Sequence, residues 1–119
     1  MKKFLRSVAY ASNGIRYTFA TEKNIRVLLL IVIAEISVAL LLEVPRLELL
    51  LLLWIAAVLF ALELVNTAVE RLADRVTTQH DVQIGIVKDV MAGAVMIASL
   101  FAALIACVIF YQPVLKFLQ

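Results

Sequence analysis

The sequence contains only one cysteine, three glycines and two prolines in 119 residues, and these shortages exclude several kinds of site. With a single cysteine, Cys107, the chain can form neither an intramolecular disulfide nor a cysteine-based metal cluster. The glycines stand alone at positions 14, 85 and 93, so there is neither a P-loop nor the glycine-rich loop of protein kinases. Any bound nucleotide would therefore be held by side chains and a metal ion.

Charged residues are also scarce, at 17%, whereas 65% of the residues are hydrophobic. A soluble domain of this length could not bury so much apolar surface, so we expect a membrane protein. The apolar residues form three blocks, each about as long as a membrane-spanning helix: 27–42, 47–62 and 90–111. Because no apolar stretch follows the N-terminal cations before the first block, we expect no cleaved signal peptide.

The predicted fold is all-α, with an amphipathic surface helix and three transmembrane helices in a single domain. The surface helix is expected over about 1–22, where apolar residues recur at near-helical intervals among polar residues and cations. It could be a simple membrane anchor or a lid over a site. Pro45 disfavours helix at the preceding residue and predicts a tight hairpin between the first two spans. The spans are expected at about 26–44, 47–70 with a cytoplasmic extension to 76, and 89–111.

The distribution of cations predicts the orientation, because Lys and Arg resist translocation across the membrane. Of the eleven cations, six precede the first span and three lie between the second and third, which leaves only Arg46 and Lys116 for the outer side. We therefore place the N-terminus and the 71–89 segment in the cytoplasm. The small net charge of +2 favours anionic headgroups as neighbours and not nucleic acid.

Polar residues lie on one face of the cytoplasmic half of the second spanning helix. At 3.6 residues per turn, four of them form a narrow stripe: Glu63, Asn66, Glu70 and Asp74. Like charges on one face repel, so such a stripe is favourable mainly beside a bound cation, and its oxygen ligands suit Mg²⁺. Glu63 falls about one turn inside the hydrocarbon, where carboxylates are usually functional. A solvated helix face remains the alternative for Glu70 and Asp74.

Two pairs of charged residues flank the spans. Glu22 stands four residues before Arg26, which predicts an ion pair within one helix, although Glu22 could also be a further carboxylate at the membrane level of the stripe. Lys88 and Asp89 open the third span. Asp89 could be only a helix cap, whereas Lys88 beside free helix N–H groups could bind phosphate.

These residues resemble the signature of the prokaryotic diacylglycerol kinase family, which includes undecaprenol kinases. The resemblance lies in residues 63–74 and 88–95, and it extends upstream through Tyr10, 13–16 and 22–26 to cover nearly the whole chain. It implies a multi-pass lipid kinase of the bacterial inner membrane, which transfers phosphate from ATP to the primary hydroxyl of a membrane lipid alcohol. It also implies a homotrimer whose active sites are shared between neighbouring subunits.

The resemblance implies a role for each site residue. Glu63 would be the catalytic base, supported by Asn66, and would take the proton of the lipid hydroxyl. Mg²⁺ would be bound by Glu22 and Glu70, and together with Lys88 it would neutralise the triphosphate. Nucleotide contacts would come from Tyr10, Glu22, Glu70, Asp74, Lys88 and Asp89. The residues near the lipid substrate would be Arg16, Asn24, Arg26 and Glu63.

Two features depart from the family pattern. The connector has Gln79-His80-Asp81 where the family usually has Glu-Tyr-His, so His80 is either a solvated loop residue or a ligand. Glu35, near the middle of the first span, has no family counterpart. It could make a polar contact within a trimer, or it could be the titrating carboxylate of a small proton-coupled transporter, which is the alternative function. A third class is a non-catalytic membrane assembly factor, which would not depend on nucleotide.

The sequence also bears on the choice of lipid. Residues 92–95 and 13–16 are more similar to the undecaprenol kinases of Gram-positive bacteria than to proteobacterial diacylglycerol kinases. The resemblance therefore favours undecaprenol slightly over diacylglycerol.

Overall fold

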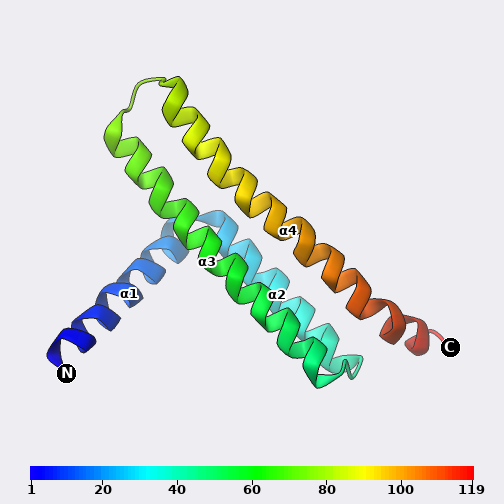
Figure 1. The fold of residues 1–119 in the computed structure, drawn as a ribbon. Coiled ribbons are helices and arrows are strands. Elements are labelled where there is room, and N and C mark those ends of the chain that lie inside the picture. Colours follow the sequence, from blue (N-terminus) through cyan, green and yellow to red (C-terminus); the bar gives the residue numbers. More distant parts are fainter.

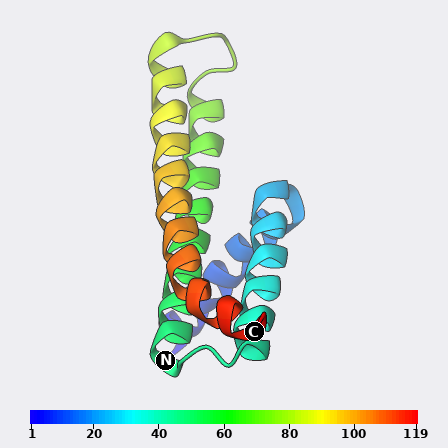
Figure 2. The ribbon, with the colours of Figure 1, turned by 90° about the vertical axis from the view of Figure 1, so that its right-hand side faces the viewer.

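The computed structural model describes all 119 residues as four α-helices joined by short connections (Figure 1). The long helices α3 and α4 form an antiparallel hairpin, and α2 packs against the outer half of α3 (Figure 2). Helices α2, α3 and α4 are long and apolar enough to cross a membrane, which confirms the predicted all-α fold with three spans. The helix bounds are α1 Lys2–Thr21, α2 Lys23–Leu41, α3 Arg46–Val76 and α4 Val82–Phe117.

An elbow at Glu22 turns the chain from α1 into α2. Glu22 has extended backbone angles (φ −97°, ψ 125°), so it belongs to neither helix. Arg26 Nη1 donates to the carbonyl oxygens of Phe19 at 2.8 Å and Ala20 at 3.0 Å, which satisfies acceptors that the end of α1 leaves free. The predicted Glu22–Arg26 ion pair is therefore wrong, because the elbow interrupts the helical spacing on which it depends.

Helix α1 points away from the bundle, in a direction that crosses that of the spans (Figure 1). The apolar side chains of its N-terminal half, including Phe4, Leu5 and Val8, are exposed, whereas Phe19 near its end lies beside Phe60 of α3. An amphipathic helix in this orientation can lie in the membrane surface while α2 enters the bilayer. The elbow therefore separates the amphipathic helix from the first candidate span.

The hairpin between α2 and α3 lies where Pro45 predicts it. The amide of Val44 donates to the carbonyl of Ala39 at 2.9 Å, and Glu43 adopts a left-handed conformation with φ 52°. Pro45 then precedes the first residue of α3, where its missing N–H costs no helical hydrogen bond. From there α3 runs without interruption to Val76.

Helix α4 begins seven residues before the start expected for the third span. Asp81 caps it, since its Oδ1 accepts hydrogen bonds from the amides of Gln83 at 2.9 Å and Ile84 at 3.0 Å. Asp89 is therefore not a cap, and Lys88 does not lie beside free helix N–H groups. Both predictions were wrong because residues 82–88 belong to the helix and not to the connector.

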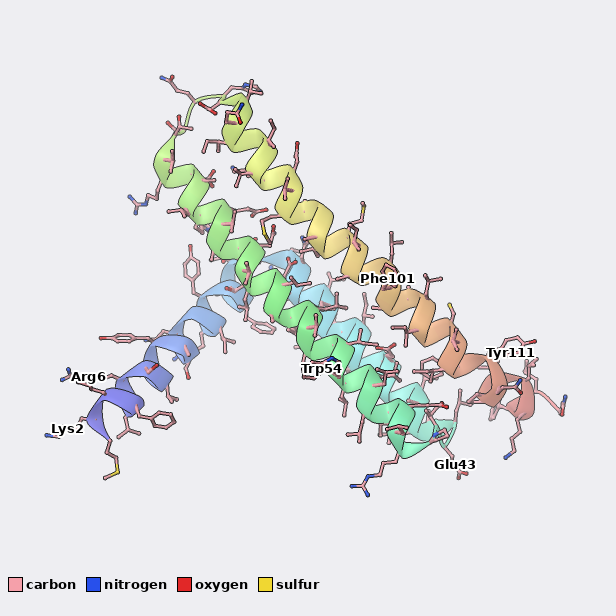
Figure 3. All side chains as sticks on the ribbon, in the orientation of Figure 1. Lys2, Arg6, Glu43, Trp54, Phe101 and Tyr111 are labelled. Carbon is pink, nitrogen blue, oxygen red and sulfur yellow. The ribbon has the colours of Figure 1, made fainter.

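The monomer buries little of its apolar surface. Its core is a small cluster of Ala39, Leu52 and Ile109, where the outer parts of the three spans meet. In the most apolar segment of each span, only 11% of the residues are buried in α2, 17% in α3 and 6% in α4. Large side chains such as Trp54 and Phe101 are exposed on α3 and α4 (Figure 3). In a bilayer such surfaces contact lipid tails or other spanning helices.

Candidate active site

The predicted polar stripe lies on α3, and its burial falls from the middle of the helix toward the C-terminal end. Glu63 is 5% exposed and Asn66 9%. Glu70 is half-buried, and the side chain of Asp74 is 59% exposed. Glu63 is therefore the most deeply buried carboxylate of the stripe.

Glu63 lies at one end of a mostly apolar groove between α2, α3 and α4, on the side of the α1–α2 elbow. The groove has a volume of about 280 Å³ and is lined by five hydrophobic side chains together with Asn24, Glu63 and Ser99. Asn24, at the start of α2, has its side chain close to the Glu63 carboxylate. The hydrophobic residues Ile31 and Leu59 line the groove nearer the α2–α3 hairpin. This arrangement suits a hydrocarbon chain that ends in a polar group beside Glu63.

Asn66 connects the buried and the half-buried parts of the stripe. Its Nδ2 donates to Glu70 Oε1 at 3.2 Å, one turn further along α3. Its Oδ1 is buried and has no hydrogen-bond partner. A buried acceptor without a partner costs about 1–3 kcal/mol, so this oxygen is available to a hydroxyl group, a metal-bound water or a cation.

Glu22 reaches the same region from the elbow between α1 and α2. Its Oε1 accepts a hydrogen bond from Arg71 Nη2 on α3 at 2.9 Å and from Thr21 Oγ1 at 3.3 Å. The guanidinium of Arg71 also lies over the ring of Tyr17, 5.4 Å from its centroid. These contacts fix Glu22 against the helix that carries Glu70.

Carboxylate and carboxamide oxygens at this level fit a hard divalent cation such as Mg²⁺. The donors are Glu22, Glu70 and the unpaired oxygen of Asn66. No three side chains among Asp, Glu, His and Cys gather closely enough to hold a metal ion by themselves. The carboxylates of this chain would thus supply only part of a coordination shell.

A second, more polar pocket lies at the tip of the α3–α4 hairpin. It has a volume of about 430 Å³, and its lining includes Asp74, His80, Lys88 and Asp89. Lys88 Nζ forms an ion pair with Asp74 Oδ1 at 2.6 Å. Asp74 is eleven residues beyond Glu63, which corresponds to about 16 Å along the helix axis. The tip pocket and Glu63 are therefore the two ends of one extended region on α3.

Several predicted residues lie away from this region. Tyr10 is 73% exposed on the free part of α1, and Arg16 makes no hydrogen bond or ion pair. Arg26 holds the end of α1, as described above. Within one chain, these three side chains do not join Glu63 or Lys88.

Sequence reasoning missed two residues that shape the site, Tyr17 and Arg71. Arg71 on α3 donates to Glu22, and the ring of Tyr17 on α1 lies against the guanidinium of Arg71. Neither contact follows a helical spacing. The only available signal was that Arg71 is a cation directly after Glu70 in the polar stretch of α3.

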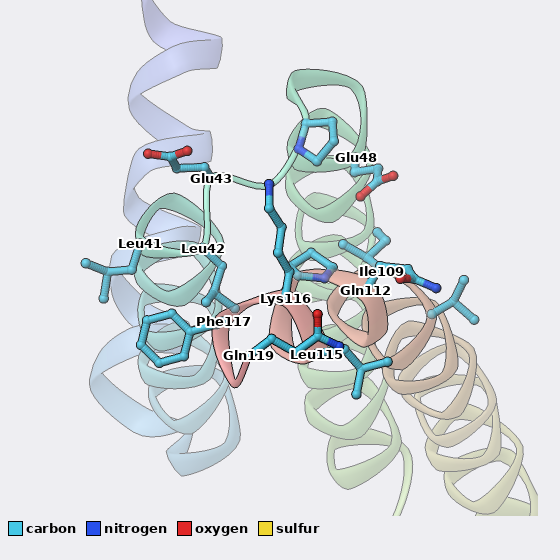
Figure 4. Close-up of a pocket in the computed structure, with 13 residues that line it drawn as sticks. Leu41, Leu42, Glu43, Glu48, Ile109, Gln112, Leu115, Lys116, Phe117 and Gln119 are labelled. Carbon is cyan, nitrogen blue, oxygen red and sulfur yellow. The ribbon is translucent and has the colours of Figure 1, made fainter.

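A hollow larger than the groove and the tip pocket lies at the opposite end of the bundle (Figure 4). It has a volume of about 720 Å³, and its charged lining residues are Glu43, Glu48 and Lys116. None of the predicted site residues lines it. The size of this hollow therefore gives no reason to move the candidate site away from Glu63.

Comparisons with known proteins match the same part of the chain. The family described as prokaryotic diacylglycerol kinase matches residues 9–110, which include every predicted site residue. An undecaprenol kinase of Bacillus subtilis (strain 168) is 30% identical over 110 residues, covering 92% of this chain and 89% of that protein. A diacylglycerol kinase of a Synechocystis species is 33% identical over 113 residues, covering 94% of this chain and 65% of that protein.

Proposed function

The chain belongs to the prokaryotic diacylglycerol kinase family of multi-pass membrane lipid kinases, and from this premise we propose that it phosphorylates a lipid alcohol at the cytoplasmic membrane interface. The phosphoryl donor is ATP, and the acceptor is the primary hydroxyl of the lipid. The observation that carries this proposal is the buried Glu63 carboxylate beside Asn24, at one end of an apolar groove.

In the proposed reaction Glu63 is the general base. The lipid chain occupies the apolar groove, and its hydroxyl lies against Glu63, with Asn24 orienting it. The hydroxyl oxygen forms a bond to the γ-phosphorus of ATP as the bond to the bridging oxygen breaks. The hydroxyl proton passes to the Glu63 carboxylate, and ADP leaves.

The triphosphate occupies the region between Glu63 and the tip pocket. Glu22 and Glu70 would hold Mg²⁺, with the free oxygen of Asn66 on the ion or on one of its waters. When bound, Mg²⁺ neutralises the charge of the phosphates. Lys88 exchanges its contact with Asp74 for a phosphate oxygen, and Asp89 and His80 line the pocket around the nucleotide.

We also propose that the protein is a homotrimer with active sites shared between subunits and with its N-terminus in the cytoplasm. The broad apolar surfaces left exposed on all three spans support the association of several copies. Tyr10 and Arg16 stand apart from Glu63 of their own chain, so they are available to a neighbouring subunit.

The proposed acceptor is undecaprenol in preference to diacylglycerol. The two named relatives differ in their lipid and are almost equally similar to this chain, so overall identity does not favour either. The preference rests on residues 92–95 and 13–16, as described above. Membership in a kinase family favours phosphoryl transfer over the proton-coupled transport that Glu35 suggested.

The test is a phosphotransfer assay. Purified protein in mixed micelles is given labelled ATP, Mg²⁺ and either undecaprenol or diacylglycerol, with heat-inactivated protein as the blank. We expect label in the lipid fraction, and more with undecaprenol. Transfer only to diacylglycerol would reverse the assignment of substrate, and no transfer to any lipid alcohol by an intact oligomer would overturn the kinase proposal.

A further inference from the structure

We propose that Arg71 is a positioning residue for the divalent-cation site, because it holds one oxygen of Glu22 and leaves the other free for the metal. The inference rests on the proposed function in one respect, namely that Glu22 is a metal ligand. It adds a residue that neither the polar stripe nor the family resemblance points to.

The first observation is that the two oxygens of Glu22 differ in their contacts. Both hydrogen bonds to this carboxylate, from Arg71 and from Thr21, reach Oε1. Oε2 accepts no hydrogen bond from any residue. Glu22 thus has the arrangement typical of a carboxylate ligand whose orientation is fixed through its second oxygen.

The second observation is that Arg71 is itself fixed. Its guanidinium lies 5.4 Å from the centroid of the Tyr17 ring, and the partial negative charge on the face of the ring attracts this cation. A planar guanidinium can stack on the ring and donate to the carboxylate at the same time, whereas a lysine ammonium cannot. Arg71 therefore connects α1, the elbow and α3 at a single point.

The third observation is the position of Arg71 in the sequence, directly after Glu70. Glu22 comes from an extended elbow residue, so no helical spacing holds it near Glu70. The contact with Arg71 is its only ion pair with α3. Without this ion pair, nothing comparable would hold Glu22 against α3 beside Glu70, the other proposed metal ligand.

The positive charge of Arg71 also repels a cation, so the two effects must be compared. Arg71 is half-exposed, and its charge is screened by water and salt. Loss of a residue that orients a metal ligand typically lowers metal affinity by about 10- to 100-fold. Positioning is therefore the larger effect, and removal of Arg71 should weaken metal binding.

The experiment measures Mn²⁺ binding, in place of Mg²⁺, by electron paramagnetic resonance of the purified full-length protein in detergent without ATP. We expect Arg71→Ala to weaken binding at least about tenfold. Arg71→Lys, which keeps the charge but not the stacking, should fall between Arg71→Ala and the wild type. The matched control is Arg75→Ala, one turn further along α3, where the side chain is exposed and makes no ion pair. It should remain within twofold of the wild type.

A further variant separates the failure of this inference from failure of the site itself. If Glu22→Gln weakens Mn²⁺ binding but Arg71→Ala leaves it unchanged or tighter, Arg71 has no positioning role and the inference is overturned. If the wild type does not bind Mn²⁺, or if Glu22→Gln binds it as tightly as the wild type does, the proposed metal site fails and the inference with it. Should Arg71→Ala aggregate, Arg71→Lys decides, since wild-type affinity in that variant would also overturn the inference.

Discussion

Lys88 on α4 donates a hydrogen bond from its ammonium group to the Asp74 carboxylate on α3, with 2.6 Å between Nζ and Oδ1. Both side chains are substantially exposed, and an ion pair of this kind contributes only about 0–1 kcal/mol to stability. The main consequence of the pair is that it keeps the ammonium group inside the tip pocket. A triphosphate can then compete with Asp74 for Lys88 at little cost in stability.

The first prediction concerns Lys88. Replacement by alanine should raise the Michaelis constant for ATP or slow turnover by orders of magnitude, because the phosphates lose a cation that neutralises their charge. Thermal unfolding should change little, since the pair is exposed. Steady-state kinetics at varied ATP, with a melting curve on the same preparation, provide the measurement.

Arg75→Ala is the control for this prediction, because Arg75 is an exposed cation on α3 that makes no ion pair. Its effect on turnover should be less than about tenfold. If Lys88→Ala affects only the expression level, then Lys88 is merely a cation that orients the protein in the membrane.

The second prediction concerns Glu70. Glu70→Gln keeps the size of the side chain and an oxygen that can accept the hydrogen bond from Asn66, but it removes the charge that attracts Mg²⁺. We expect much weaker binding of Mg²⁺-ATP and nearly complete loss of turnover, while the oligomer remains intact. Binding of a fluorescent ATP analogue and size-exclusion chromatography measure the two effects. Near-normal activity at ordinary Mg²⁺ concentrations would remove Glu70 from the site.

The third prediction concerns Asn24, which lines the groove beside Glu63. Asn24→Ala should raise the Michaelis constant for the lipid about two- to tenfold, the effect of losing one hydrogen bond to the substrate. Binding of ATP should not change. Lys23→Ala is a suitable control, because Lys23 is exposed next to Asn24 and does not line the groove. An equal effect of both variants would argue against a contact between Asn24 and the lipid.

Much of the fold was predictable because the bilayer imposes a simple rule on the sequence. Apolar blocks of spanning length and Pro45 indicate the three long helices and the outer hairpin. The early start of α4 was missed, because Asp81 looks like one polar connector residue among several until its oxygen is seen to cap the helix. Capping depends on backbone geometry that composition does not reveal.

The candidate site was predictable in part for a similar reason. The stripe from Glu63 to Asp74 follows from helical spacing, and its graded burial is what a helix leaving the membrane requires. The contact between Glu22 and Arg71 joins residues 49 positions apart. No local pattern encodes such a pair, and the elbow that makes it possible also removes the ion pair that spacing predicts for Glu22 and Arg26.

The last prediction concerns Glu63, which the proposed mechanism requires as the base. The hydroxyl of a lipid alcohol is confined to the membrane interface by its hydrocarbon chain, so the group that takes its proton must lie at that depth. Glu63 is the one carboxylate of the stripe that is buried, and it is also the one that lines the apolar groove. Depth and access to the lipid therefore select the same residue.

Glu63→Gln tests this role, because glutamine keeps the volume and most hydrogen-bonding capacity of the side chain but cannot accept the proton. The variant should still form the oligomer and bind Mg²⁺-ATP, yet lose lipid phosphorylation by about two to four orders of magnitude, the usual contribution of a general base. Glu48→Gln, at the outer end of the same helix, is the control and should retain activity. ATP affinity and lipid turnover should be measured on one preparation. Turnover within about tenfold of the wild type would assign the base to another group, such as Asp89, whereas loss of ATP binding together with turnover would make Glu63 a metal-holding or structural residue.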